Sequence, residues 1–500
     1  MPSSLAEPWL RGVAANTAAP SDVLLRLLHP DARAAWEILC QERALPADVV
    51  DAVIAHPERS VRRAFARNRY ATPAQRSRLV DDPDAFVRAD LAGGPRPRLG
   101  RVEALPDDII EILLTRQDNA DHDQPVTADE IRQELAFSGQ IPMSFHRGMW
   151  AHKNPELRVQ GAGWWLWLTP GQRDALLADP DPAVRDAARR NSRILDPEAM
   201  EADLPEADCH HRGLLLFNYA VSRGVAETCL AEGRDLRSLA GNRYTPADAV
   251  ARLARHPDPH VRQRVAGRAD LDPLLLKELA EDPDHTVRTR AVVHPLPRTW
   301  AQRDAIDRVD GRTAEAIGPV GEMPVEPETD WYGACAVSPH PLLRRVAATC
   351  PGLPRVLVHR LADDPDPQVR YLLAHNHPLA PPVTVLDAFI ATPRQRPYLL
   401  TLPHLPRTGL RHLLDHEDPD VRGLAAADPT LDRPPIHLLT DTDADVRRAA
   451  AASPLLSLDL IATLLDSPET AEGAAANPSL SAERLHELLD RADLPRTTAR

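Results

Sequence analysis

The 500-residue sequence is poor in the residue types that build large aromatic cores or membrane spans. Aromatic residues make up 4% of it, with 6 Phe and 6 Tyr. Only Lys153 and Lys277 among its 59 basic residues are lysines, a bias typical of a GC-rich genome. No apolar run approaches the roughly 18 residues of a transmembrane helix, and the first twenty residues lack the pattern of a signal peptide. We therefore expect no association with a membrane.

Cysteine is also scarce, and its spacing excludes common metal motifs. The five cysteines are scattered and lack CxxC spacing, which predicts a reducing, cytoplasmic setting rather than a disulfide framework. Cys209, His210 and His211, with Cys229 nearby, could suggest metal ligands. Adjacent histidines on a helix point about 100° apart, and no companion motif completes a tetrahedral set. We expect no metal and no other cofactor.

The charge balance and the missing catalytic motifs narrow the function further. The chain has 73 acidic and 59 basic residues, which gives a net charge of −14. This charge argues against non-specific binding to nucleic acid phosphates. It contains no phosphate-binding loop, no GxSxG and no HExxH motif, and no GxGxxG after a strand. These absences predict a protein that is not an enzyme.

Proline, by contrast, is abundant, and it occurs within an internal repeat. The 50 prolines would break long helices wherever they fell at random. One phrase, represented by DPDPAVRDAARRN, recurs along the chain with a Val-Arg pair in fixed register. The arginine of this phrase recurs every 24–27 residues, apart from one interval of 44 residues and one of 56. The positions are Arg62, Arg88, Arg132, Arg158, Arg185, Arg212, Arg237, Arg262, Arg288, Arg344, Arg370, Arg396, Arg422 and Arg447, with Ala471 as a degenerate last copy.

Each copy carries the signals of two short helices. Pro180 and its counterparts lie five residues before the arginine, often after an aspartate, which is typical of a helix start. The helix ends near an asparagine such as Asn242, and a second helix begins at Thr245-Pro246 or an equivalent pair. Neither helix can bury its apolar stripe alone. We therefore expect an all-α protein, an α-solenoid of about fifteen stacked two-helix repeats.

This repeat resembles the leucine-rich repeat variant (LRV) family, and it also resembles short HEAT-like repeats. The resemblance rests on the phrase DPDPxVRxxxAxN followed by a Leu-rich helix, and it covers roughly residues 45–490. It implies a right-handed superhelix of short helices that serves as a binding scaffold. The first-described member of the family holds an iron–sulfur cluster on an N-terminal cysteine group. Cys40 stands alone here, so no such cluster is carried over.

The breaks in the repeat suggest a division of the chain. We expect an N-terminal cap at residues 1–44, a solenoid arm at 45–297, an irregular stretch or hinge at 298–335, and a second arm with its cap at 336–500. The first arm contains an insertion near 95–130, which is either a solvated loop or an element that binds a partner.

The repeated arginines could form either a structural ladder or a ligand-binding stripe. An acidic residue precedes most of them by four positions, so the two can share a helix face, or the arginine can reach the acid of a neighbouring repeat. We favour the structural ladder. Its arginines are Arg62, Arg88, Arg185, Arg262, Arg288, Arg370, Arg422 and Arg447, and its acids are Asp84, Asp181, Asp258, Asp284, Asp366, Asp418 and Asp443.

A tryptophan cluster is the other candidate site. Trp150, Trp164, Trp165 and Trp167 fall within 18 residues of a chain that has only eight tryptophans. They either fill space left by small neighbours such as Gly161 or form an exposed aromatic patch for a partner.

The function that fits these features is a non-enzymatic scaffold that presents a curved surface to a protein partner, with nucleic acid not expected as a ligand. The tryptophan segment and the first insertion are the expected contacts. The alternative is a DNA-binding or DNA-repair protein similar to the HEAT-like alkylpurine glycosylases. A continuous basic groove near Trp164 and Trp167 would favour that alternative.

Overall fold

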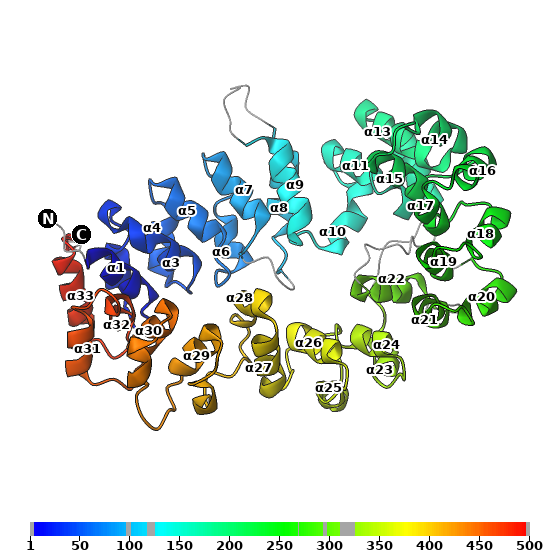
Figure 1. Ribbon diagram of the computed structural model, residues 1–500. Helices are drawn as coiled ribbons and strands as arrows, with labels where there is room; N and C mark the ends of the chain where they lie inside the picture. The colour runs from blue at the N-terminus through cyan, green and yellow to red at the C-terminus, as the bar shows by residue number, and fades with distance from the viewer. Residues whose placement is uncertain are drawn as a thin grey trace. The chain divides into compact units, whose positions relative to one another are not determined.

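The computed structural model describes residues 5–96, 102–117, 126–268, 270–293, 298–310 and 326–496, and these residues form helices and no strand (Figure 1). The described chain is therefore all-α, as the sequence predicts. It divides into two compact units. Unit 1 contains Met1–Pro142 together with Pro381–Arg500, and unit 2 contains Met143–Ala380. The arm expected at residues 45–297 thus contributes to both units.

Unit 1 is built from both ends of the chain. Its N-terminal helices are α1 (Ala6–Ala15), α2 (Ser21–Arg26), η1 (Pro30–Ala35), α3 (Trp36–Gln41), α4 (Ala47–Ile54), α5 (Arg59–Ala66), α6 (Pro73–Ser77), α7 (Ala85–Gly93), α8 (Asp107–Thr115) and α9 (Ala128–Ser138). Its C-terminal helices are α27 (Pro382–Ala391), η5 (Pro393–Gln395), α28 (Arg396–Leu399), η6 (Arg411–Leu413), α29 (Pro419–Ala426), η7 (Ile436–Thr440), α30 (Ala444–Ala451), α31 (Leu458–Leu464), α32 (Ala471–Ala475) and α33 (Ala482–Arg491). The elements named η are 3₁₀ helices.

Unit 2 is one continuous stretch of chain. Its helices are α10 (Met143–Gly148), η2 (Met149–Ala151), α11 (Pro155–Ala162), η3 (Trp165–Trp167), α12 (Pro170–Leu177), α13 (Pro182–Ser192), η4 (Arg193–Leu195), α14 (Pro197–Asp203), α15 (His210–Asn218), α16 (Arg223–Glu232), α17 (Leu236–Gly241), α18 (Ala247–Leu253), α19 (Pro259–Ala266), α20 (Pro273–Ala280), α21 (His285–Val293), α22 (Trp300–Val309), α23 (Thr329–Ala336), α24 (Pro341–Ala347), α25 (Arg355–Ala362) and α26 (Pro367–Asn376).

The helices begin where the repeat phrase predicts. Asp181 precedes α13, and its carboxylate accepts hydrogen bonds from the backbone N–H groups of Ala183 and Val184. Pro182 occupies the first helical position, where its missing N–H costs nothing. Thr72 caps α6 through a reciprocal capping box. These local signals set the residue at which each short helix begins.

The first helix of each repeat packs against the first helix of the next. In unit 1, α3 contacts α5, α5 contacts α7 and α7 contacts α9, while a second helix lies between successive members. The buried side chains are small and aliphatic, as in α30, where Val446, Ala450 and Ala451 face inward. Alanine-rich helix ends permit close packing, which explains why few aromatic residues are needed.

Asparagines at helix ends join neighbouring repeats. The Asn68 side-chain amide donates to the carbonyls of Cys40 and Arg43, at 2.7 and 2.9 Å, in the repeat before it. Asn242 and Asn477 make the same pair of bonds to the repeats that precede them. We call these residues the asparagine clamps. All three are buried, so each clamp satisfies carbonyls that a helix end leaves unpaired.

The two ends of the chain stack as if they were consecutive repeats. Helix α1 packs against α32 and α33, so blue and red ribbons lie side by side in Figure 1. Asn16 forms a fourth asparagine clamp, donating to the carbonyls of Ala475 and Asn477 at 3.1 and 2.8 Å. A side chain at Gly12 would collide with backbone of α32, and one at Gly473 would collide in the same way with α30. The segment expected as an N-terminal cap thus continues the C-terminal stack.

The two irregular stretches are partly helical. Within the insertion expected near 95–130, α8 forms and α9 begins, while residues 97–101 and 118–125 lie outside the described residues. Because α9 packs directly on α7, the stack continues past this insertion. Within the stretch at 298–335, α22 forms, α23 begins, and residues 311–325 lie outside the described part.

Candidate functional site

The repeated arginines bind an aspartate of the next repeat and backbone carbonyls of their own. Arg62 donates to both carboxylate oxygens of Asp82, from Nε at 2.6 Å and from Nη2 at 3.1 Å. Arg88 in turn donates from Nη1 to the backbone carbonyl of Asp82 at 2.6 Å. One aspartate is therefore held between two successive arginines. The fork geometry is the strongest arrangement available to an arginine and a carboxylate.

Four further pairs repeat this arrangement. They are Arg158–Asp179, Arg262–Asp282, Arg344–Asp364 and Arg422–Asp441. We call the five acids, including Asp82, the bridging aspartates.

The acids four residues before each arginine have a different primary role, because each accepts the backbone N–H two residues later at a helix start. This holds for Asp84, Asp181, Asp258, Asp284, Asp366, Asp418 and Asp443.

Only some arginines of the repeat register have this fork to a bridging aspartate. For four of the five bridging aspartates, the repeat before has a histidine at the same position (His56, His152, His256 or His416), and the imidazole Nδ1 accepts the backbone N–H two residues later. For Asp364 the preceding repeat has Ser338, whose hydroxyl oxygen accepts the equivalent N–H. Elsewhere among the described residues, Arg185, Arg288, Arg370 and Arg447 form no ion pair, and each donates to carbonyls of its own repeat.

The paired arginines lower the pKa values of their aspartate partners. A hydrogen bond from Arg262 holds the pKa of Asp282 below its ordinary value, and Arg158 does the same for the pKa of Asp179. Both carboxylates therefore stay ionised at neutral pH. A guanidinium engaged in this way is not available to a phosphate, so these rungs serve stacking rather than ligand binding.

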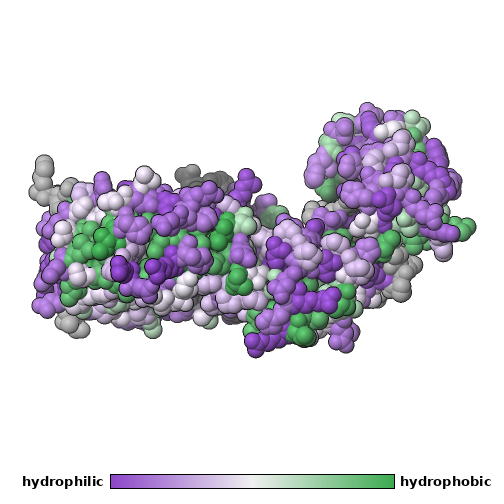
Figure 2. Space-filling view, turned by 60° about the horizontal axis from the view of Figure 1, so that its bottom comes forward, coloured by the Kyte–Doolittle hydropathy of each residue, from purple (hydrophilic) through white to green (hydrophobic). Residues whose placement is uncertain are grey.

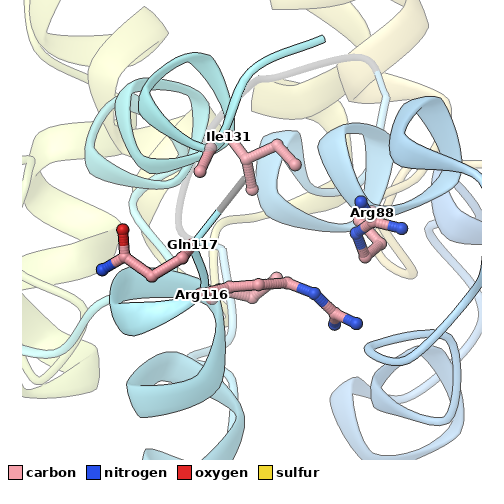
Figure 3. A pocket seen from close by; sticks show the side chains of 6 residues that line it. Arg88, Arg116, Gln117 and Ile131 are labelled. Carbon is pink, nitrogen blue, oxygen red and sulfur yellow. The ribbon is translucent and has the colours of Figure 1, made fainter. Parts of the chain in front are cut away.

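A small hollow lies at one end of the ladder in unit 1. Figure 3 shows Arg88, Arg116, Gln117 and Ile131 around it, contributed by α7, the end of α8 and α9. Its volume of about 10 Å³ is close to that of a single water. Arg116 also donates to the carbonyl of Val80 at 2.9 Å. We assign this hollow to packing between repeats, because no organic ligand fits it.

Most of the tryptophan segment faces the core of unit 2. Trp165 is buried in a cluster against which Trp150 packs. Trp164 and Trp167 are half-buried, with ring centroids 5.0 Å apart, and Trp164 also contacts His146. Burial lowers the pKa of His146, which favours its neutral form at this contact. Of this segment, Trp164 and Trp167 are therefore only partly accessible to solvent, while Trp165 is buried.

The residues considered as metal ligands do not assemble. Cys209 is exposed and precedes α15, whose first residues are His210 and His211. Throughout the described ranges, no three His, Cys, Asp or Glu side chains are placed to hold a metal ion. The same ranges contain no helix long and apolar enough to span a membrane.

Exposed aliphatic side chains recur at the start of the second helices. Each is the first or second residue of its helix and is more than half exposed. They are Val383, Ile436 and Leu458 in unit 1, and Leu274 and Val356 in unit 2. We call them the aliphatic row. In unit 1, Val383 borders a hollow of about 580 Å³ that Leu386, Leu405 and other residues line. Single exposed apolar residues are normal, but a recurring register is not random.

Sequence reasoning did not find a cluster of arginines in unit 2. Arg173, Arg243 and Arg303 come from α12, from the turn after α17 and from α22, and they interact electrostatically with one another or with Tyr244. We call these four residues the arginine cluster. The available signal was the tripeptide Asn-Arg-Tyr, which occurs at residues 68–70 and 242–244. It identifies two equivalent turns, but not the distant arginines that approach one of them.

Comparisons with known proteins assign no function to these sites. Neither a scan against protein-family models nor a search of curated proteins finds a match to this chain. The contacts within the described residues therefore carry the functional assignment that follows.

Proposed function

We propose that the chain is an α-solenoid of the LRV type and works as a non-enzymatic scaffold that binds a protein partner. The aliphatic row is the observation that carries this proposal. Burying a Val, Leu or Ile side chain contributes about 1.5–3 kcal/mol, and these side chains forgo that contribution within the chain itself. A partner that covers them would recover it. The hollow beside Val383 offers such a partner a place for one apolar side chain.

The surface chemistry favours a protein over a nucleic acid. Figure 2 shows hydrophobic patches set in a mostly hydrophilic surface. Unit 1 uses Arg62 and Arg422 in ion pairs with bridging aspartates, so its ladder supplies no continuous stripe for phosphates. The net charge of −14 points the same way. A protein surface with apolar side chains and a polar rim fits these features better.

The test is capture of partners from the source cells by the immobilised full chain, followed by a change in the aliphatic row. We expect the triple variant Val383→Asp, Ile436→Asp, Leu458→Asp to lose at least nine tenths of a captured partner, because three charges would be desolvated at the contact. The amount of each partner, measured by quantitative mass spectrometry, is the readout.

Two controls make this result specific. Phe137→Asp places the same charge on an exposed apolar residue of α9 outside the row, and it should retain the partner. Trp164→Ala with Trp167→Ala tests the tryptophan segment. If the tryptophan variant loses the partner and the row variant keeps it, the contact lies on the aromatic segment and the aliphatic row is not the binding surface.

A further inference from the structure

The two ends of the chain meet in a contact that no nearby stretch of backbone supports. In unit 1, helices α1 and α2 pack on α32 and α33 from the opposite end of the sequence (Figure 1). We call this contact, which joins residues 9–26 to residues 465–495, the seam. The other extensive helix contacts among the described residues of unit 1 join helices that are close along the chain, such as α5 with α7 and α30 with α32. If the seam opened, the stacks on either side of it would keep their own contacts, because each repeat contacts only its neighbours.

The buried centre of the seam repeats the stacking chemistry found between consecutive repeats. Val13 and Ala14 are fully buried there. The indole Nε1 of Trp9 donates to the carbonyl of Leu465 at 2.8 Å, and the clamp of Asn16 makes two more bonds to the C-terminal end. The N-terminal end therefore presents apolar surface and directed donors that the face formed by α32 and α33 satisfies.

A buried cation lies at the edge of this centre. Arg26 is 3% exposed, and its Nη2 donates to the carboxylate of Asp490 and to the carbonyl of Leu494, both at 2.6 Å. Its Nε donates to the carbonyl of Pro495 at 3.1 Å. A guanidinium buried without such partners would be costly. In a chain whose seam is open, this group needs water or another copy of the C-terminal end as its partner.

The rim of the seam is charged and partly exposed to solvent. Arg11 donates from Nε to Glu472 at 2.8 Å, and Asp22 forms a hydrogen bond with Nε2 of His486 at 2.9 Å. The side chains of Arg11 and Asp22 are 42% and 68% exposed. An apolar centre inside a polar rim is the organisation of interfaces between separate proteins. The seam therefore has the chemistry of a contact that can form between two molecules.

We propose that a second copy of this chain is the partner that the seam fits. In the exchanged dimer, α1 and α2 of each copy pack on α32 and α33 of the other, so both seams close and every contact of the seam is kept. Exchange of identical elements between copies needs no new complementary surface. This proposal is independent of the aliphatic row and does not require the scaffold function.

The chain's own C-terminal end competes with the second copy. Two sites on one chain meet at an effective concentration of about 1 mM, so the closed single chain predominates at micromolar concentration. After unfolding in urea and refolding, we expect about a tenth of the chains in exchanged dimers at about 100 µM and under about 1% at about 1 µM. Size-exclusion chromatography with light scattering measures both fractions. A parent chain that refolds only as a monomer at the higher concentration overturns the proposal.

Reversing charges at the rim directs the exchange. One variant carries Arg11→Glu and another carries Glu472→Arg, so each alone places like charges across its seam, whereas each seam of their exchanged dimer joins opposite charges. Like-charge contacts across an interface are strongly unfavourable. The two variants refolded together at about 20 µM should therefore form a mixed dimer in most chains, against under about a tenth for either variant alone. Arg448, which also binds Glu472 at 2.9 Å, keeps Asp445 as a partner at 2.8 Å in the Glu472→Arg variant.

Unit 2 supplies a matched control pair. Arg255 donates from Nε and Nη2 to Glu278 at 2.8 and 2.6 Å, between neighbouring repeats of one continuous stretch. Arg255→Glu refolded with Glu278→Arg should give no more dimer than either variant alone. The proposal is also overturned if these variants form as much mixed dimer as the seam variants, or if the seam variants stay monomeric together. The parent experiment contains no substitution, so it decides the question even where a variant fails to fold.

Discussion

The two Asn-Arg-Tyr turns share a backbone and differ in what surrounds them. In both turns the asparagine Oδ1 accepts the tyrosine N–H at 2.7 Å, and the asparagine clamp holds the preceding repeat. In unit 1 the tyrosine is 43% exposed and bonded to its neighbouring arginine. In unit 2 the equivalent hydroxyl is buried, and it interacts with the neighbouring Arg243 and with Arg173 of another repeat.

This difference lies in the distant side chains that approach each turn and not in the turn itself. The asparagine is used for stacking in both units, so its role follows from the repeat itself. The tyrosine and its arginine project from the same turn, and their surroundings depend on which distant helix approaches them. Only unit 2 brings α22 to the turn, with Arg303 as the buried cation. Four pairs of substitutions test whether the two turns differ in this way.

Removing an asparagine clamp should lower the free energy of unfolding more than any other of these substitutions, and by the same amount in the two units. Asn68→Ala and Asn242→Ala each leave two buried carbonyls unpaired, which should lower the free energy of unfolding by about 3 kcal/mol. Asn376→Ala is the control, because that exposed amide donates only to Leu372 of its own helix, and it should cost under about 0.5 kcal/mol. Urea denaturation measures all three. A gap above about 1 kcal/mol between the first two would show that the turns are not equivalent.

The bridging aspartates should come next, again with equal effects. Asp282→Asn in unit 2 and Asp441→Asn in unit 1 each leave an arginine of a nearly buried pair without its acid, at a cost of about 2–3 kcal/mol at pH 7. Arg262 and Arg422 hold the pKa values of these acids below the ordinary value of about 4. The stabilisation is therefore present above that value and is lost as the pH falls through the lowered folded-state pKa.

Denaturation curves recorded between pH 7 and pH 2 test whether this stabilisation is lost as the pH falls. The difference in stability between parent and variant should shrink toward zero at the acid end. A difference that stays constant down to pH 2 would mean that the aspartates act through packing rather than through charge.

The third effect separates the two units. Arg303→Met removes a buried cation whose Nη1 makes no hydrogen bond in the described part of the chain, and it should raise the free energy of unfolding by about 1–2 kcal/mol. Arg407→Met changes an exposed residue and should stay within about 0.5 kcal/mol of the parent. Thermal unfolding provides the comparison. A loss of stability at Arg303 would assign that side chain a structural contact and remove the contrast between the units.

The smallest effect distinguishes the two tyrosines. Tyr70→Phe loses an exposed hydrogen bond to Arg69 and should cost about 0.5 kcal/mol. Tyr244→Phe removes a buried hydroxyl without a well-formed bond and should be neutral or slightly stabilising. Replicate urea denaturation of the two variants measures this difference in stability. If Tyr244→Phe is the more damaging of the two, its hydroxyl already has a strong partner within the protein.

The sequence predicts local structure well because its signals are local. Asp181 followed by Pro182 marks a helix start through contacts within three residues, and the structure confirms it. The ladder partners were harder to assign, because Arg62 reaches Asp82 twenty residues away. Helical spacing does not imply that separation, although the alternation of His56 with Asp82 is visible in the sequence.

The longest-range features could not be derived from a repeat period. Val-Ala-Ala-Asn before residue 17 matches Ala-Ala-Ala-Asn at 474–477, yet nothing local states that these two copies stack on each other. The arginine cluster depends on how successive repeats rotate, and small rotations at each stacking contact add up along the chain. The spacing of the repeats along the sequence does not predict the total rotation between distant repeats.

The contact between the two chain ends sets an order of events during synthesis. Asn16 and Asn477 are bonded across a sequence separation of 461 residues. At about 5–20 residues per second, the first clamp residue would wait roughly 25–90 s for its partner to leave the ribosome. Unit 2, a continuous stretch, is complete well before that moment. We therefore expect the nascent chain to expose the α1 face until α32 and α33 have been synthesised. Products truncated before these helices would leave the surface around Trp9 and Gly12 uncovered and prone to capture by chaperones.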